Sequence, residues 1–492
     1  MVTIGDLPVT RAGTNGAVRT ARYRYVPDQS AHINGYERVR RDSNMPDPTD
    51  EPNVLLVVLD SVRARNCSLY GYERETTPFL RSFADRATVY TQARAPSNWS
   101  LPSHVSLFTG LETHEHRVTV HDRLRPGNTV FDALEDGGYE TGLFTENGFV
   151  AAHDVGLNEA FGTVRTVPEA YDDRYDTTSS NPGPDGFYYV DAFVSWLDDR
   201  DGPWAACVNL MDAHRPFEPR AEFDRWGDGR AREIQHSLPV RWEWAFHGGE
   251  RSFEELDALE SLYDGGIRQD DAIVQELIGT LERRGSFSET LVVICGDHGD
   301  GFGERGLLPG EPRAVSHIVP MSESLLHVPL VVSAPGQTDP RRIDRPAALT
   351  AFPEVALGRV DRSCGFAADT VYATKQPVTG ELRERFERAC DRVEPYTATS
   401  RAVYVADPER PGSVEKWYRW GLTATACRIP EAGAVELGPA IDPGAVDTAF
   451  GPKAPDSTGG PATLDADEIR EPIEGDGVSE ATREQLSALG YY

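Results

Sequence analysis

An apolar, β-branched run at 291–295 that stops abruptly at a carboxylate and an imidazole constrains the fold most strongly. Glycines flank the run, which is typical of a buried central strand in a parallel sheet. In open α/β sheets, ligands bind outside the carboxyl ends of such strands. Asp297 and His298 follow the run, so we expect both in the ligand crevice. A carboxylate oxygen beside an imidazole nitrogen suits a divalent metal.

A second apolar run, at 54–59, ends in the same way at Asp60. If the two strands are neighbours in one sheet, the Asp60 carboxylate projects into the same crevice as Asp297. Either acidic residue alone could simply cap the helix that follows it. Two such strand ends, with a candidate nucleophile between them in the sequence, favour a shared catalytic site.

Ser100 is that candidate nucleophile. Pro102 favours the first turn of a helix, where its missing N–H costs nothing, and Gly110 is suited to end that helix. Ser100 is therefore expected at or just before a helix N-terminus, where free N–H groups favour an anion. A hydroxyl that is also coordinated by a metal has a lowered pKa and can act as a nucleophile. The alternative is an ordinary N-cap serine.

Strand-like and helix-like segments alternate after position 53, which is typical of a mainly parallel sheet with helices on both faces. Strands are expected at 139–145 and 204–211, and helices at 187–197 and 253–284. After about 340 the alternation thins, and a smaller antiparallel unit is expected instead. Its predicted elements are a helix at 381–393 and strands at 402–406 and 417–424.

Together these motifs resemble the sulfatase family, which belongs to the alkaline phosphatase superfamily. The resemblance rests on the strand and aspartate at 53–60, Ser-x-Pro-Ser at 100–103 and Gly-Asp-His-Gly at 296–299. Further landmarks are a His-x-Pro-aromatic segment at 214–217 and His-Val-Pro at 327–329. The resemblance implies an α/β, alkaline-phosphatase-like fold, with a mainly parallel central sheet flanked by helices and a smaller C-terminal α+β subdomain.

On this basis we expect four segments. They are an irregular N-terminal extension at 1–50, a sulfatase-like catalytic domain at 51–340, a smaller C-terminal subdomain at 341–450, and a linker with a C-terminal segment at 451–492.

The resemblance also implies roles for individual residues. The expected metal ligands are Asp60, Ser100, Asp297 and His298. The expected catalytic residues are Ser100, His214 as general acid, and His104, and the expected substrate-binding residues are Arg63 and His317. Alternatives stay open for three of them: a solvated loop histidine for His214, a second metal position for His317 and a surface salt bridge for Arg63.

Three positions depart from the usual sulfatase pattern. His104 stands where many members have an arginine that supports conversion of the nucleophile to formylglycine, so we expect Ser100 to stay unmodified. Ser61 replaces a second aspartate, and His298 replaces an asparagine common in calcium-using members. The set looks more like the phosphoglycerol-transferring and lipoteichoic-acid-synthase branch. We expect one divalent ion (Mn, Zn, Ca or Mg), and the histidine favours manganese or zinc.

Several other residues are weaker candidates. Glu304 and Arg305 follow the predicted metal-binding segment at 296–299. Tyr70 and Trp99 could line the pocket or belong to the core. Three histidines, at 114, 116 and 121, lie close together in the sequence. Their spacing is not that of a zinc site, so we interpret them as loop histidines.

The composition points to an acidic cytoplasmic enzyme. The 492 residues carry a net charge of −30, and Lys375, Lys416 and Lys453 are the only lysines. This balance favours adaptation to high salt, where charge repulsion is screened, and disfavours general nucleic-acid binding. The six cysteines show no paired spacing, and no apolar run reaches the length of a membrane span.

The sequence thus predicts a metal-dependent, sulfatase-like hydrolase in which metal-bound Ser100 attacks a sulfate or phosphate ester and forms a covalent serine ester. The expected substrate is a small-molecule or glycan ester. Two alternatives are a phosphoglycerol-type phosphotransferase and a catalytically silent relative that binds an anion. The oligomeric state is left open.

Overall fold

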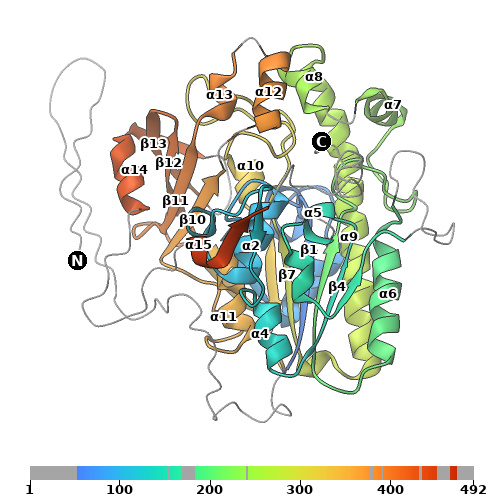
Figure 1. The fold of residues 1–492 in the computed structure, drawn as a ribbon. Helices are drawn as coiled ribbons and strands as arrows, with labels where there is room; N and C mark the ends of the chain where they lie inside the picture. The colour runs from blue at the N-terminus through green and yellow to red at the C-terminus, as the bar shows by residue number, and fades with distance from the viewer. Residues whose placement is uncertain are drawn as a thin grey trace, which may run out of the picture.

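The computed structural model of the protein describes residues 52–151, 154–168, 183–239, 242–376, 378, 380–390, 392–430, 435–450 and 466–473. The N-terminal extension predicted at 1–50 and most of the segment predicted at 451–492 lie outside these residues. A large sheet flanked by helices and a smaller second sheet make up most of the described part (Figure 1).

The large sheet has eight strands in the order β5-β4-β6-β1-β7-β8-β2-β9. Its central strands are parallel, whereas β8 runs antiparallel to both of its neighbours. The strands are β1 (Asn53–Leu59), β2 (Thr88–Arg94), β4 (Glu140–Thr145), β5 (Thr163–Arg165), β6 (Trp204–Leu210), β7 (Thr290–Gly296), β8 (Leu330–Ser333) and β9 (Arg341–Ala348). This arrangement confirms the predicted mainly parallel central sheet.

The apolar sequence of β1 is explained by its burial on both faces of the sheet. Val54, Leu56 and Val58 belong to one hydrophobic core, and Leu55 and Val57 belong to the core on the opposite face. A strand covered by helices on both faces needs apolar side chains at every position, because successive side chains point to opposite faces.

Helices cover both faces of this sheet (Figure 1). One core includes side chains from α2 (Ser100–Thr109), α4 (Val130–Asp136) and α11 (Phe352–Ala356). The opposite core includes side chains from α6 (Gly186–Asp198) and α9 (Leu256–Arg284). The helices predicted at 187–197 and 253–284 correspond to α6 and to α9 with the 3-10 turn at Phe253–Glu255 before it.

The second sheet is antiparallel throughout, in the order β10-β11-β12-β13-β14. Its strands are β10 (Thr370–Lys375), β11 (Ser400–Ala406), β12 (Val414–Trp420), β13 (Thr423–Ile429) and β14 (Glu436–Ala440). This confirms the expected smaller unit near the C-terminus.

Two predicted elements in this region were wrong in detail. The strand predicted at 417–424 spans a hairpin: β12 ends at Trp420, and Gly421 turns the chain with φ of 56°. The helix predicted at 381–393 ends earlier, because α12 covers Gly380–Ala389 and a separate short helix, α13 (Glu394–Thr397), carries Pro395 in its first turn. Proline favours the start of a helix rather than its interior.

The two sheets share one hydrophobic core and one buried ion-pair cluster. Tyr404 and Tyr418 of the second sheet belong to the same core as β1 and α2. Glu323, in the short helix α10 (Glu323–Leu326), pairs with Arg94 of β2 at 2.8 Å and with Lys416 of β12 at 3.0 Å. The large sheet also extends past the boundary predicted at 340, since β9 pairs with β2.

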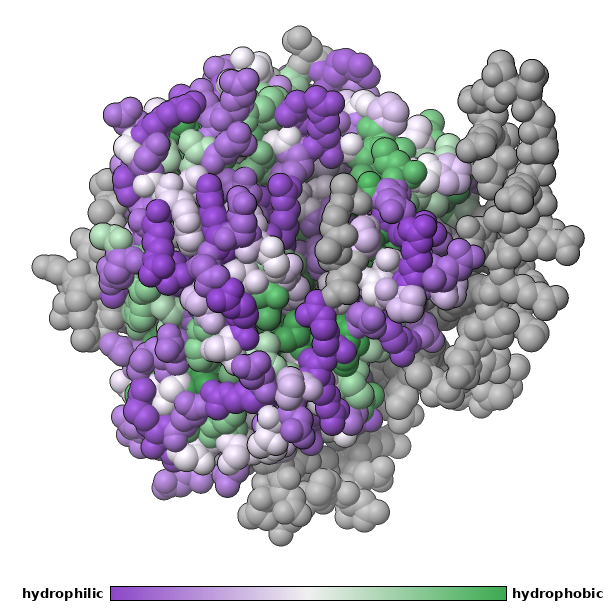
Figure 2. Space-filling model, turned by 180° about the vertical axis from the view of Figure 1, so that it is seen from behind, coloured by the Kyte–Doolittle hydropathy of each residue, from purple (hydrophilic) through white to green (hydrophobic). Residues whose placement is uncertain are grey.

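The surface in Figure 2 is mainly hydrophilic, as the charge of −30 suggests. Within the described residues, no helix combines the length and the apolar character needed to cross a membrane.

Candidate active site

The two strand ends singled out in the sequence meet at one edge of the large sheet. β1 and β7 are parallel neighbours, and Leu59 pairs with Gly296. Asp60 and Asp297 therefore follow equivalent positions on adjacent strands. Both carboxylates and the His298 ring are fully buried, with no exposed surface. In the described part of the chain, these three residues form the one group whose ligand atoms lie close enough for a shared ion, all within 4.8 Å.

Ser100 completes this cluster as the first residue of α2. Trp99 before it is extended, with φ of −159°, and the helix turns Ser100 toward the strand ends. The Ser100 hydroxyl oxygen lies 3.1 Å from Nε2 of His298 and 3.5 Å from Oδ2 of Asp60. The structure thus brings together the four residues predicted as ligands.

The hydrogen bonding of His298 suits a metal ligand. Its Nδ1 lies 2.9 Å from the Gly299 carbonyl and must donate a proton to it. In the neutral ring this leaves the Nε2 lone pair directed toward Ser100, Asp60 and Asp297. Histidines that bind metals usually donate their other N–H in this way.

The surroundings of the two carboxylates are compatible with a bound cation. Burial, followed by the charge of nearby Asp60, raises the pKa of Asp297, although His298 and His104 oppose this. Burial also disfavours the charged form of Asp60, but His214, His298 and His104 together lower its pKa. Oδ2 of Asp297 is buried and lacks a hydrogen-bond partner. Two adjacent carboxylates with an unpartnered oxygen, beside an imidazole nitrogen, fit a divalent ion.

His104 lies one helical turn beyond Ser100. Its Nδ1 donates to the Ser100 carbonyl at 2.9 Å and lies 3.6 Å from Oδ2 of Asp297. The ring is fully buried and packs edge-on against Phe108. His104 thus connects the helix that carries Ser100 with a predicted metal ligand, whereas its catalytic role remains a prediction.

His214 and His317 lie beside the cluster. The His317 ring centroid is 4.8 Å from that of His298 and 5.6 Å from that of His214. His214 follows β6, its Nδ1 donates to the Arg215 carbonyl at 2.8 Å, and burial lowers its pKa. Both rings retain a small exposed fraction, 7% for His214 and 9% for His317. They are therefore the predicted residues best placed to meet a substrate.

The predicted contact between Arg63 and a substrate anion is wrong. The Arg63 guanidinium is fully buried and forms ion pairs with Glu260 and Glu304. It also donates to Asn66 Oδ1 at 2.6 Å and to the Asp300 carbonyl at 2.9 Å. A buried guanidinium needs several hydrogen-bond acceptors. The sequence around Arg63 does not reveal them, because one acceptor, Glu260, comes from α9, far along the chain. Arg63 therefore connects the loop after β1 with α9 and with the segment after β7 that carries Asp300 and Glu304.

These contacts predict that substitution of Arg63 lowers the stability of the protein but does not weaken substrate binding. Arg63→Met leaves Glu260 and Glu304 without their cation, and breaking a buried pair costs about 3 kcal/mol or more. We expect the urea midpoint to fall and the KM of the remaining folded enzyme to change little. Exposed Arg65, 3.4 Å from the same Glu304, provides the control: Arg65→Ala should change stability by less than about 0.5 kcal/mol. A raised KM at unchanged stability would restore the substrate-binding role.

The weaker candidates are mostly structural. His116 contacts the Ser106 hydroxyl and accepts the Val118 N–H, and burial lowers its pKa to about 3. His114 packs against Tyr372 and Phe450. Where the structure describes the chain, the three histidines at 114, 116 and 121 form no metal group. The Tyr70 hydroxyl accepts the backbone N–H of Leu330, and Trp99 packs edge-on against Phe149. Glu304 forms an ion pair with Arg63.

Two sets of contacts with the predicted ligands were not expected from the sequence: those of Asn147 and those of Ser61. Nδ2 of Asn147, just after β4, donates to Oδ2 of Asp60 at 2.7 Å. Ser61 has φ of 63°, which lets its N–H donate to Asp297 at 3.1 Å while its hydroxyl donates to Asp60 at 3.0 Å. The strand-end rule that singled out Asp60 places Asn147 at the same edge of the sheet, but it does not indicate that Asn147 contacts Asp60.

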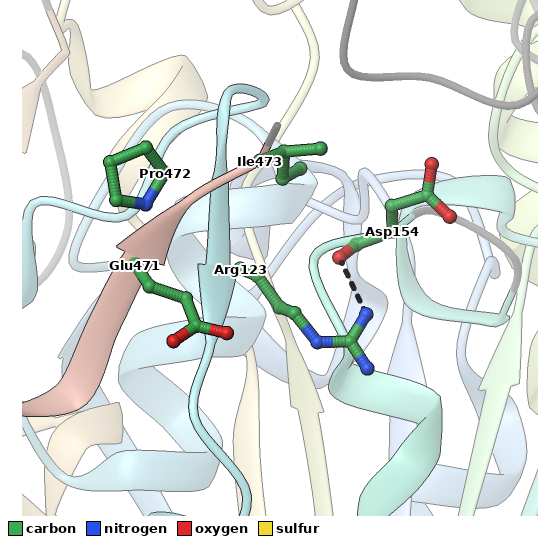
Figure 3. Close-up of a pocket in the computed structure, with 5 residues that line it drawn as sticks. All are labelled: Arg123, Asp154, Glu471, Pro472 and Ile473. Atoms are coloured by element: carbon green, nitrogen blue, oxygen red, sulfur yellow. Dashed lines mark hydrogen bonds between the residues drawn. The ribbon is translucent and has the colours of Figure 1, made fainter. Parts of the chain in front are cut away.

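A separate pocket of about 500 Å³ lies beside the small sheet of β3 (Asp122–Leu124) and β15 (Arg470–Pro472). In Figure 3, Arg123 reaches toward the Asp154 carbonyl, with Glu471 beside it. Among the residues that the structure describes, the lining contains neither a histidine nor any of the clustered ligands. Its chemistry does not match that of the strand-end cluster.

Comparisons with known proteins agree with this geometry. The sequence model of the sulfatase family matches residues 52–360, which is more than half of the chain. The chain belongs to the sulfatase family. Among curated relatives, a Delta 4,5-hexuronate-2-O-sulfatase of Bacteroides thetaiotaomicron is 22% identical over 317 residues, and a choline-sulfatase of Rhizobium meliloti is 26% identical over 335 residues. Each match covers 58% of this chain, and 63% and 64% of the respective relatives, so the chain spans less than two thirds of their length.

Solved structures show the same fold. The phosphonate monoester hydrolase of Agrobacterium radiobacter aligns with a TM-score of 0.56 at 17% identity, over 83% of this chain and 92% of that one. A 2-O GAG sulfatase, BT1596, aligns with a TM-score of 0.54 at 16% identity, over 75% and 83%. At this identity the likeness concerns the alkaline-phosphatase-like fold alone, and it confirms the predicted fold class.

Proposed function

We propose that this sulfatase-family protein is a metal-dependent hydrolase that cleaves a sulfate or phosphate ester with Ser100 as the nucleophile. The observation that carries the proposal is the position of Ser100 at the start of α2. Its hydroxyl oxygen lies within 3.5 Å of both Nε2 of His298 and Oδ2 of Asp60. Curated sulfatases among the relatives support the same ester class.

Asp60, Asp297, His298 and Ser100 would hold one divalent ion. When bound there, the ion supplies positive charge that favours the ionised form of the serine hydroxyl and offsets charge on the transferred group. The nitrogen ligand and the small number of carboxylates favour manganese or zinc over calcium.

The chain's own residues account for the remaining steps. The Ser100 hydroxyl releases its proton to solvent, its oxygen attacks sulfur or phosphorus in line, and the bond to the leaving oxygen breaks as the serine ester forms. His214 donates a proton to the departing oxygen. Free backbone N–H groups in the first turn of α2 stabilise the charge that develops on the transferred group. Water then attacks the serine ester, which releases sulfate or phosphate and restores the hydroxyl.

The proposal is tested by metal reconstitution followed by product analysis. Protein stripped with a chelator should regain turnover with manganese or zinc on a panel of aryl and glycan sulfate and phosphate esters. Release of inorganic sulfate or phosphate supports the hydrolase, whereas transfer of the group to an added alcohol at the expense of release favours the transferase. Metal-independent turnover would overturn the proposed site.

His214 gives a prediction that depends on the leaving group. Protonation matters for an alkyl leaving group and little for a nitrophenolate, which departs without a proton. His214→Ala should therefore reduce alkyl ester cleavage about a hundredfold more than nitrophenyl ester cleavage. The measurement is kcat/KM for both substrate types in wild type and variant. Equal losses on the two substrates would mark His214 as a binding residue.

A further inference from the structure

The Asp60 carboxylate is held by two neighbours that do not belong to the proposed ligand set. Oδ1 accepts the Ser61 hydroxyl at 3.0 Å, and Oδ2 accepts Nδ2 of Asn147 at 2.7 Å. Ser61 is adjacent in sequence, but Asn147 follows β4, which β6 separates from β1. Asn147 therefore fixes the position of Asp60 from across the sheet, and it is only 2% exposed.

The direction of the Asn147 amide is determined by its surroundings. Its Oδ1 accepts the backbone N–H of Phe149 at 3.0 Å, at the start of α5 (Gly148–Ala151). Rotating the amide by 180° would place its NH2 against that N–H and its oxygen against the Asp60 carboxylate. Both contacts would become repulsive, so the NH2 group must face Asp60.

The loop that carries Asn147 is itself well supported. The Asn147 N–H donates to the Thr145 hydroxyl at 2.9 Å, and Asn209 of β6 donates to the same hydroxyl at 3.0 Å. Asn209 also approaches Oδ2 of Asp60, but at 3.5 Å. Of the two amides, Asn147 makes the short contact.

We propose that Asn147 is a positioning residue for the metal site, acting through Asp60. This inference rests on the proposed function, since it concerns the affinity of the ion that Asp60 would bind. The amide donor orients Asp60 so that the carboxylate faces Ser100 and His298. Partners of this kind, which touch a ligand but not the metal, typically contribute 10–100-fold to metal affinity.

The test separates the Asp60 contact from the turn at α5. In Asn147→Ser, the short hydroxyl can still accept the Phe149 N–H, but it cannot reach Asp60. Asn147→Ala removes both contacts. Asn128, whose side chain donates to the backbone carbonyl of Arg125, provides the control variant Asn128→Ala. The probes are Mn²⁺ and Zn²⁺, titrated into chelator-stripped full-length protein against a chromogenic competitor.

We expect both Asn147 variants to bind the ions 10–100-fold more weakly than wild type, and Asn128→Ala to bind normally. At saturating metal, most of kcat should return, because Asn147 does not touch the substrate. Wild-type affinity in Asn147→Ser, with weak binding only in Asn147→Ala, would show that Asn147 acts through the turn and would overturn the inference. A wild-type protein that binds neither ion would instead overturn the proposed function.

Discussion

Replacing Asp297 with alanine is expected to abolish tight metal binding and turnover together. Asp297 supplies a buried carboxylate with an unpartnered oxygen, 3.3 Å from Nε2 of His298. Its loss removes a charged ligand, so the drop in metal affinity should exceed the 10–100-fold typical of residues that only support a ligand. Metal content by elemental analysis and kcat/KM on the best ester measure the two effects.

Thermal unfolding gives an independent readout of the same change. An ion that binds only the folded protein stabilises it, so a chelator should lower the midpoint temperature of unfolding of the wild type. The midpoint of Asp297→Ala should not respond to the chelator. Exposed Asp198, which pairs with Arg284, provides the control variant Asp198→Ala, and this variant should behave like wild type. Stoichiometric metal in active Asp297→Ala would refute the assigned ligand set.

Replacing Ser100 with alanine should remove nearly all turnover while the fold is retained. Ala is a good helix former, and the hydroxyl is not needed as an N-cap because Ser100 is already the first helical residue. Loss of a nucleophile costs on the order of 10⁴-fold or more in kcat. Circular dichroism and kcat report the fold and the reaction separately.

Ser106 offers a matched control within the same helix. It is also buried in α2, but it contacts His116 and Thr113 rather than the strand-end cluster. Ser106→Ala should retain turnover. Comparable losses in the two variants would mean that α2 is merely sensitive to substitution, and that Ser100 has no special chemical role.

Those parts of the site that depend only on neighbouring residues in the sequence could be predicted. An apolar run that ends at Asp60 or Asp297 indicates a strand end, and Ser100 before Pro102 indicates a helix start. The parallel pairing of β1 with β7 then brings Asp60 and Asp297 together. The central sheet and its long covering helix were predictable for the same reason.

Features that depend on distant partners were not predictable in this way. The buried role of Arg63 depends on Glu260 and Glu304, which lie 197 and 241 residues away in the chain. The contact of Asn147 with Asp60 depends on the strand order, which the residues of β4 do not determine. The hairpin at Gly421 was hidden because both of its strands are rich in residues that favour strands.

Unmodified Ser100 is expected to carry the transferred group during turnover, and a mass spectrum of the peptide that contains it shows this directly. Metal-loaded enzyme, prepared from its native host, is mixed with excess ester, quenched in acid during turnover, digested and sequenced by tandem mass spectrometry. We expect two forms of the peptide, one with unmodified serine and one with a sulfuryl or phosphoryl group on Ser100. Formylglycine at position 100, or an adduct on another residue, would contradict this expectation.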